Sequence, residues 1–364
     1  MEIIKVLIVD DSAFMRKLIT EFLSENPLIQ VIGTARNGED AIKKVKQLKP
    51  TVVTLDVEMP ILNGIEALKI IMKENPVPVV MLSSLTKEGA ESTLQAIQLG
   101  AVDFIAKPSG AISLDLYKIK VQLQEKVISA CKANIQSMIK FSKRSNSSTL
   151  NVEDCSKIEL CSSKAVSSVN SWNHLSKKII CIGTSTGGPR ALQQVLSKLP
   201  KNISAPILVV QHMPPSFTKS LAKHLNSLAE INVKEAEEGE LIKNGTAYIA
   251  PGGFHMSVRA IGTSLAIQLD QSPPINGLRP SVDVLFNSIS KITQYSIIAV
   301  IMTGMGSDGA KGLVSLKKNT NVLAIAESKE TAIIFGMPKA AIETSFVDKV
   351  ELVEKIASLI MKYV

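Results

Sequence analysis

Aromatic residues and cysteines are scarce in this chain. Aromatic residues make up only 4% of it, which leaves little surface for stacking nucleic-acid bases. Its four cysteines (Cys131, Cys155, Cys161 and Cys181) form no CxxC pair and lie near no histidine pattern, which argues against a zinc site or a disulfide framework.

Membrane-spanning and secretory segments are also missing from the sequence. No run approaches the roughly 20 consecutive apolar residues that span a bilayer. The N-terminus, MEIIKVLIVDD, lacks the basic, apolar and small-residue order of a signal peptide. We therefore expect a cytoplasmic protein that is not inserted in a membrane.

The overall composition is that of a globular protein, with 45% hydrophobic and 20% charged residues over a length of 364 that favours two domains. A net charge of +8 is compatible with nucleic acid, an anionic membrane surface or an acidic protein partner. Basic residues are spread along the chain and acidic clusters such as KEAEEGE interrupt them, so no nucleic-acid partner is expected.

Strand-like and helical patterns alternate from residue 5 to about 125. The apolar runs are KVLIVD, VIGTA, TVVTLDV, VPVVMLSS and AVDFIAK. The segments between them place apolar residues at spacings of three and four, as in amphipathic helices. This alternation predicts an α/β domain, residues 1–125, with a doubly wound sheet of five parallel strands. A helical pattern then continues to about Ile139.

Serine dominates residues 141–176, where apolar periodicity disappears, which predicts a flexible linker. We assign residues 126–176 to a helical extension and this linker. Residues 177–364 alternate again and predict a second doubly wound domain, with a Rossmann-like, mostly parallel sheet. Its segments GTAYIAPGGFHMSV and SLAIQLD, joined by RAIGT, predict a hairpin added to that sheet.

Reactive side chains follow the strands of the first domain. They are Asp10 and Asp11 after the first strand, Asp56 at the third, Ser83 at the fourth and Lys107 after the fifth. The ends of parallel strands converge at one sheet edge, where ligands bind. Three carboxylates there favour a hard cation such as Mg²⁺, and Asp56 could then form an aspartyl phosphate. Taken singly, such acids are also consistent with solvated or helix-capping positions.

The segments LIVDDSAFMR, LDVEMPILNG, VVMLSS and AVDFIAKP resemble, in this order, the receiver domain of response regulators, which has a flavodoxin-like fold. The resemblance implies that Asp56 is the phosphoacceptor. It further implies Mg²⁺ ligands at Asp10, Asp11, Asp56 and the backbone carbonyl of Glu58, and phosphoryl contacts from Ser83 and Lys107. It also implies a cis Lys107–Pro108 bond. Phe104 would be an aromatic residue that changes rotamer on phosphorylation, or a buried core phenylalanine.

The segment IICIGTSTGGPR, residues 179–190, is either a phosphate-binding loop or a turn that presents a nucleophile. It contains neither GxGxxG nor GxxxxGK[ST], which disfavours the phosphate-binding loop. Gly183 to Gly187 match GxSxG, a strained turn that exposes a serine, here Ser185.

A nucleophilic serine needs a base and an acid that orients the base. His212 follows the strand PILVVQ at the edge expected for Ser185, and His255 also lies close to a strand end. Asp308, in the glycine-rich loop after IIAVIM, is the candidate acid, and the Met305 amide in that loop is the candidate oxyanion donor. The chain order Ser185, His212, Asp308 differs from that of α/β-hydrolases.

The segments IGTSTGGP, VVQHMP, YIAPGGFHM, RPSVDVLF, IMTGMGSDGAKG and FGMPKAA resemble the catalytic domain of chemotaxis protein-glutamate methylesterases, over about residues 178–360. The resemblance implies Ser185 as nucleophile, His212 as base and Asp308 as its orienting acid. One departure is Glu327, where the family often has glutamine. His255 and Arg279 match family motifs near the site, and we expect each to have either a structural role or a role in the active site.

The two resemblances together imply a phosphorylation-activated hydrolase. It would demethylate glutamate methyl esters on methyl-accepting chemotaxis receptors, with glutamine deamidation as a second activity. A chemotaxis histidine kinase would be the phosphodonor, Mg²⁺ would serve the receiver, and the esterase would need no cofactor. The receiver would cover the active-site edge until Asp56 is phosphorylated.

One alternative is a non-catalytic response regulator whose second domain is a phosphorylation-dependent protein-binding module. A transcription factor fits less well, because no compact helix-turn-helix follows the linker.

Overall fold

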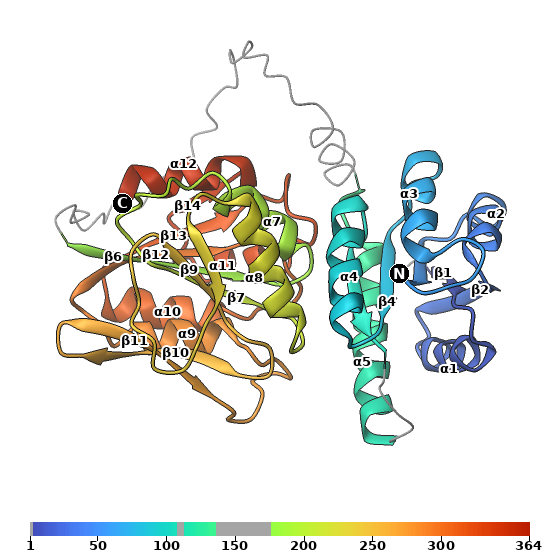
Figure 1. Ribbon diagram of the computed structural model, residues 1–364, viewed down its shortest axis with the longest axis horizontal. Coiled ribbons are helices and arrows are strands. Elements are labelled where there is room, and N and C mark those ends of the chain that lie inside the picture. Colours follow the sequence, from blue (N-terminus) through green and yellow to red (C-terminus); the bar gives the residue numbers. More distant parts are fainter. Residues whose placement is uncertain (1–2, 108–112, 136–175) are drawn as a thin grey trace, which may run out of the picture.

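Two parallel β-sheets organise the chain, one in each half, and each is covered by helices on both faces (Figure 1). The computed structural model describes residues 3–107, 113–135 and 176–364. Pro108 and residues 141–175 of the expected linker lie outside the described residues, so the cis Lys107–Pro108 bond and the linker stay predictions.

The first domain contains five parallel strands in the order β2-β1-β3-β4-β5, which confirms the predicted doubly wound topology. The strands are β1 (Ile4–Val9), β2 (Ile29–Ala35), β3 (Val52–Asp56), β4 (Val79–Ser83) and β5 (Asp103–Ala106). The helices are α1 (Ala13–Ser24), α2 (Gly38–Leu48), α3 (Gly64–Glu74), α4 (Lys87–Leu99) and α5 (Ser113–Cys131). Every residue of β3 and β4 is buried, as expected for strands covered on both faces.

Helix α5 extends past residue 125, so the helical extension expected from residue 126 starts inside the last receiver helix. Its buried residues Leu123, Val127 and Ala130 pack in one cluster with Val6 and Ile8 of β1. The covering of this sheet face therefore continues to the end of α5.

The large sheet of the second domain contains seven strands, all parallel, in the order β14-β13-β12-β6-β7-β9-β8. These strands are β6 (Lys177–Thr184), β7 (Ile207–Gln211), β8 (Asn232–Glu235), β9 (Thr246–Ile249), β12 (Tyr295–Ile301), β13 (Val322–Glu327) and β14 (Lys349–Glu351). One face packs on α7 (Gly188–Leu196), α8 (Phe217–Leu228) and α12 (Val353–Tyr363). The other packs on α9 (Val282–Ile289), α10 (Ala310–Asn319) and α11 (Met337–Glu343).

The predicted hairpin forms, from β10 (His255–Ile261) and β11 (Ser264–Asp270), but its expected attachment to the large sheet is wrong. It is a separate two-stranded sheet. Its apolar side, including Met256 and Ile267, packs in one cluster with Phe286 of α9. The segment TAYI belongs instead to β9, which is buried between β7 and β8.

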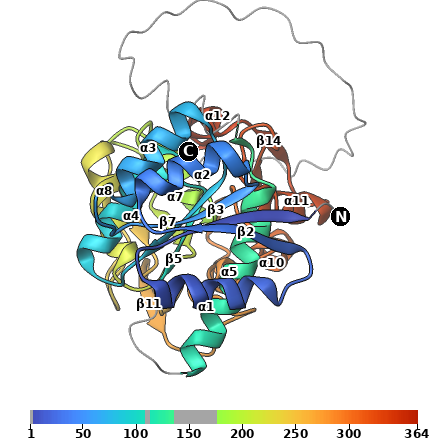
Figure 2. The same cartoon turned by 90° about the vertical axis from the view of Figure 1, so that its right-hand side faces the viewer.

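The two domains meet along α4, β5 and α5 of the first and along α7, α8 and the loop before α11 of the second (Figures 1 and 2). Phe104 of β5 stacks on Phe217 of α8, with ring centroids 4.6 Å apart and planes inclined by 15°. Gln98 of α4 hydrogen-bonds His224 of α8. Asn134, which follows α5, donates from its backbone N–H to the carbonyl of Ile333 at 3.1 Å.

Among the helices that the structure describes, none is long and apolar enough to cross a lipid bilayer.

Candidate active site and phosphorylation site

Ser185 lies in the turn between β6 and α7, at the carboxyl edge of the large sheet. Its backbone is held on both sides. The Ser185 N–H donates to the carbonyl of Thr303 at 3.0 Å, and Nε2 of Gln211 donates to the Ser185 carbonyl at 2.9 Å. The turn is therefore anchored to the strands on either side of β6.

Two glycines explain the small residues around Ser185. Gly187 has a φ of 80°, in the left-handed region that favours glycine, and it precedes the first residue of α7. Gly304 faces the serine, since a Cβ added there would lie 2.8 Å from the Cβ of Ser185. The two glycines therefore allow the backbone conformation and the close packing that the turn of Ser185 requires.

His212 directly follows β7, the strand beside β6, and its backbone N–H donates to the carbonyl of Thr184 at 3.2 Å. This bond fixes its backbone next to the residue before Ser185. The Nε2 atom of its ring lies 2.8 Å from Oδ2 of Asp308. The structure thus joins the two residues expected to form the base and its acid.

Asp308 is held by the N-terminus of α9. It accepts hydrogen bonds from the Ser281 hydroxyl at 2.8 Å, the Val282 N–H at 2.6 Å and the Asp283 N–H at 3.1 Å. Burial opposes ionisation, but these bonds and the contact with His212 outweigh it and hold the pKa of Asp308 below its ordinary value. The side chain is thus an oriented carboxylate at neutral pH.

Asp283 in turn accepts hydrogen bonds from backbone N–H groups that follow Asp308 in the chain. Its Oδ1 accepts from the N–H groups of Gly309 at 2.9 Å and Gly312 at 2.7 Å, at the start of α10. Each helix N-terminus is therefore held by an acid from the other element. This role of Asp283 was not predicted from the sequence, although a serine and an acid at the start of an apolar run signal a helix N-terminus.

The Met305 amide lies in the loop after β12, one residue beyond the glycine that faces Ser185. Both backbone polar groups of the neighbouring Gly304 are hydrogen-bonded. Its N–H donates to the carbonyl of Ile334 at 3.0 Å, and its carbonyl accepts from the N–H of Met337 at 2.8 Å. Within the described part of the chain no hydrogen bond engages the Met305 N–H. This amide is therefore available to a ligand.

Thr303 links the nucleophile turn to Glu327, at the end of β13. Oε2 of Glu327 accepts from the Thr303 N–H at 2.7 Å, and Oε1 accepts from the Thr331 hydroxyl at 3.0 Å. Burial raises the pKa of Glu327 to about 7. Glu327 thus places an ionisable group behind the residue that anchors Ser185.

His255 and Arg279 hold the loop that precedes α9. Nε2 of His255 lies 3.3 Å from the carbonyl of Pro273, and NH1 of Arg279 donates to the carbonyls of Gln271 and Ser272 at 2.7 and 3.0 Å. Both side chains therefore have structural contacts, and Asp308 pairs with His212 rather than with His255.

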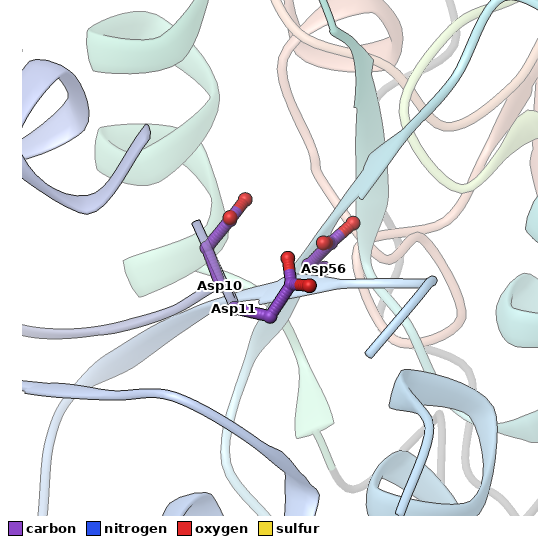
Figure 3. A group of neighbouring side chains, drawn as sticks. All are labelled: Asp10, Asp11 and Asp56. Atoms are coloured by element: carbon purple, nitrogen blue, oxygen red, sulfur yellow. The ribbon is translucent and has the colours of Figure 1, made fainter. Parts of the chain in front are cut away.

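The carboxylates of Asp10, Asp11 and Asp56 gather at the edge of the receiver sheet (Figure 3). One oxygen from each lies within 4.8 Å of the others, and within the described ranges no other cluster of acids, thiols and imidazoles meets this geometry. Nζ of Lys107 lies 2.9 Å from Asp10 and 2.7 Å from Asp56. Burial raises the pKa of Asp56 to about 6, since it outweighs the opposing effect of Lys107.

The other residues expected around the phosphorylation site are arranged as follows. The Ser83 hydroxyl donates to the carbonyl of Gly89 in α4 at 2.9 Å. The Glu58 N–H donates to Oδ1 of Asp56 at 3.4 Å. Phe104 is buried against the second domain, where it stacks on Phe217.

Comparison with known proteins defines a response regulator joined to a hydrolase domain. A model of the response regulator receiver domain matches residues 6–116, and one described as CheB methylesterase matches residues 180–360. The crystal structure of the Thermotoga maritima CheB methylesterase catalytic domain is similar, with a TM-score of 0.50 and 48% identity; the match covers 52% of this chain and 100% of that chain.

Full-length relatives carry a more specific name. The protein-glutamate methylesterase/protein-glutamine glutaminase of Geobacillus kaustophilus is 53% identical over 364 residues, 100% of this chain and 99% of that protein. The protein of the same name from Bacillus subtilis is 50% identical over 361 residues, 98% of this chain and 97% of that protein. The chain therefore belongs to the protein-glutamate methylesterase/protein-glutamine glutaminase family, which confirms the resemblance and disfavours a non-catalytic response regulator.

Glu327 predicts a pH-dependent loss of stability in the second domain. Its pKa rises from an ordinary value of 4.5 to about 7 on folding, so the folded state binds the proton more tightly. The stabilisation of the folded domain that comes from proton binding at Glu327 is therefore fully present below pH 4.5 and is lost as the pH rises through 7. We expect Glu327→Gln to raise the Tm of this domain by several degrees at pH 8 and to change it little at pH 4.

Differential scanning calorimetry at the two pH values tests this expectation. Glu343→Gln, an exposed position on α11, is the matched control and should leave both Tm values unchanged. An equal shift of Glu327→Gln at pH 4 and pH 8 would contradict the burial explanation.

Proposed function

We propose that this chain removes methyl groups from glutamate methyl esters on methyl-accepting chemotaxis receptors in the cytoplasm, with Ser185, His212 and Asp308 as its catalytic triad. The observation that carries the proposal is the 2.8 Å contact between His212 Nε2 and Asp308, beside the anchored turn of Ser185. The family to which the chain belongs supports it.

The reaction starts at the Ser185 hydroxyl, which attacks the ester carbonyl while His212 takes its proton. Asp308 engages Nε2, so Nδ1 is the ring nitrogen that accepts this proton. The Met305 N–H stabilises the negative charge that develops on the carbonyl oxygen. Methanol leaves with the proton from His212, and water then releases the glutamate carboxylate from Ser185, with His212 again as base.

The same groups can convert a glutamine side chain to glutamate. Ser185 attacks the amide carbonyl, and ammonia leaves in place of methanol with the proton from His212. Water then hydrolyses the same acyl-enzyme. This second reaction needs no further catalytic residue, and the name shared by the full-length relatives supports it.

We propose that Asp56 is phosphorylated by a chemotaxis histidine kinase. The gathered carboxylates fit a hard cation, and Mg²⁺ would be held by Asp10, Asp11, Asp56 and the Glu58 carbonyl. Bound there, it would neutralise charge on the incoming phosphoryl group. Lys107, which already contacts Asp56, would bind a phosphoryl oxygen, and Ser83 would bind another.

We propose further that the receiver inhibits the second domain until Asp56 is phosphorylated. Its β5 contacts the active-site turn directly, because the Thr186 hydroxyl donates to Asp103. The Ser83 hydroxyl, bonded to Gly89, links the phosphorylation site to α4, which packs on α7 and α8. Recruitment of Ser83 by a phosphoryl group would break this bond and loosen the interface.

Loss of the nucleophile should abolish the reaction. Ser185→Ala removes the hydroxyl that forms the acyl-enzyme, so methanol release from methylated receptor should fall at least about a thousandfold. Ser358→Ala, on α12, is the matched control, since its hydroxyl bonds only within its own helix, and it should retain full activity. Substantial methanol release by Ser185→Ala would remove Ser185 from its role.

Loss of the phosphoacceptor should uncouple the two domains. Asp56→Asn cannot form the acyl phosphate, so it should keep its basal rate and lose stimulation by a small-molecule phosphodonor with Mg²⁺. The measurement is methanol release with and without phosphodonor. Stimulation equal to that of the unmodified chain would place the phosphoacceptor elsewhere.

Removal of the receiver should release the inhibition. A fragment of residues 177–364 should turn over severalfold faster than the unphosphorylated full chain, because Thr186 and α7 are no longer covered. The similar Thermotoga maritima domain was crystallised without its receiver, which supports independent folding of the fragment. Equal rates for fragment and full chain would argue against inhibition by the receiver.

A further inference from the structure

Arg190 is a buried cation without a partner. It lies in the first turn of α7 and is only 4% exposed. None of its three guanidinium nitrogens has a hydrogen-bond partner among the described residues. Burial lowers its pKa to about 10, so it stays protonated at neutral pH. Burying such a charge without a partner is costly, which favours any other state of the protein in which the guanidinium is solvated or paired.

Arg190 faces away from the core of its own domain. The residues of α7 that pack against the sheet include Leu192, Val195 and Leu196. Arg190 precedes Leu192 by two positions, about 200° around a helix, which places it on the opposite face. A residue on that face of a helix is commonly exposed to solvent, whereas Arg190 is buried.

The receiver lies against the helix that carries Arg190. Its helix α4 packs against α7, and Asp103 of β5 accepts a hydrogen bond from Thr186, which lies between Ser185 and Arg190 in the sequence. Figure 1 shows α4 on the side of the second domain that carries α7 and α8. Displacement of the receiver would therefore expose Arg190 together with the nucleophile turn.

The position of Arg190 suits an anion on the substrate. It lies five residues after Ser185, at the N-terminus of α7, where the helix dipole also favours negative charge. A guanidinium binds carboxylates through two parallel hydrogen bonds. Each ester that the proposed reaction hydrolyses leaves a glutamate carboxylate, so a partly demethylated substrate carries the matching group.

We infer that Arg190 is a substrate-binding residue that pairs with a carboxylate flanking the methyl ester, and that it becomes available when the receiver moves away. This inference rests on the proposed esterase function. It assigns to the buried cation a role in selecting acidic substrate sequences, while the chemistry at the ester remains with Ser185.

The test uses the full chain with phosphodonor and Mg²⁺ and two peptides that carry one glutamate methyl ester. One peptide has glutamates beside the ester and the other has glutamines there. We expect Arg190→Gln to lower the ratio of kcat/KM for the acidic peptide to kcat/KM for the neutral peptide roughly tenfold or more. A change in the fraction of molecules closed by the receiver affects both peptides equally and cancels in this ratio. Arg190→Lys should recover part of the lost preference, since it restores the charge without the forked geometry.

Arg259→Gln is the matched control, because Arg259 is exposed on β10, and it should behave as the unmodified chain. Arg190→Met, an apolar replacement, repeats the test with a residue suited to the buried position. A preference for the acidic peptide that survives in both Arg190→Gln and Arg190→Met would overturn the inference. Hydrolysis of the neutral peptide by all variants would still uphold the proposed function, whereas no methanol release by the unmodified chain from either peptide or from methylated receptor would refute that function itself.

Discussion

The arrangement of the active site depends on the backbone of Thr303. Its carbonyl holds the N–H of Ser185, and its own N–H is held by the buried Glu327. Its hydroxyl donates to the carbonyl of Thr186 and accepts from the N–H of Ile334. One residue at the end of β12 thus joins the nucleophile turn, the end of β13 and the loop before α11. A shift of any of these would move the serine relative to its base.

The receiver contacts two of the segments that Thr303 joins. Asp103 bonds the Thr186 hydroxyl, and the end of α5 packs in one cluster with Ile333 and Ile334 and with the partly buried Met305. The contact therefore reaches the flanks of Ser185 and of the proposed oxyanion donor. The proposed coupling between phosphorylation and hydrolysis therefore needs no long pathway, because the hydrogen bond between Thr186 and Asp103 joins the receiver to the turn of Ser185.

Much of this arrangement was predictable, because strand ends in parallel sheets converge. Ser185, His212 and Asp308 each follow an apolar strand, and the structure brings the last two into contact. The capture of Asp308 by the N-terminus of α9 was not predictable, since it joins segments distant in the sequence. Arg190 occupies a polar position on an amphipathic helix, so its burial was not predictable from the helical pattern. The hairpin was assigned to the wrong sheet because alternating apolar and polar residues predict which face of a strand is buried, and they do not predict which strand pairs with it.

Among the described residues, few hydrogen bonds join the two domains. Two modules of one chain meet at an effective concentration of roughly millimolar order, so an interface with a Kd of about 1 mM would be closed about half the time. A coupling free energy of about 1.4 kcal/mol would then change the ratio of closed to open molecules tenfold. With such an affinity the receiver would act as a tethered inhibitor, and phosphorylation would change the fraction of closed molecules in degrees rather than completely.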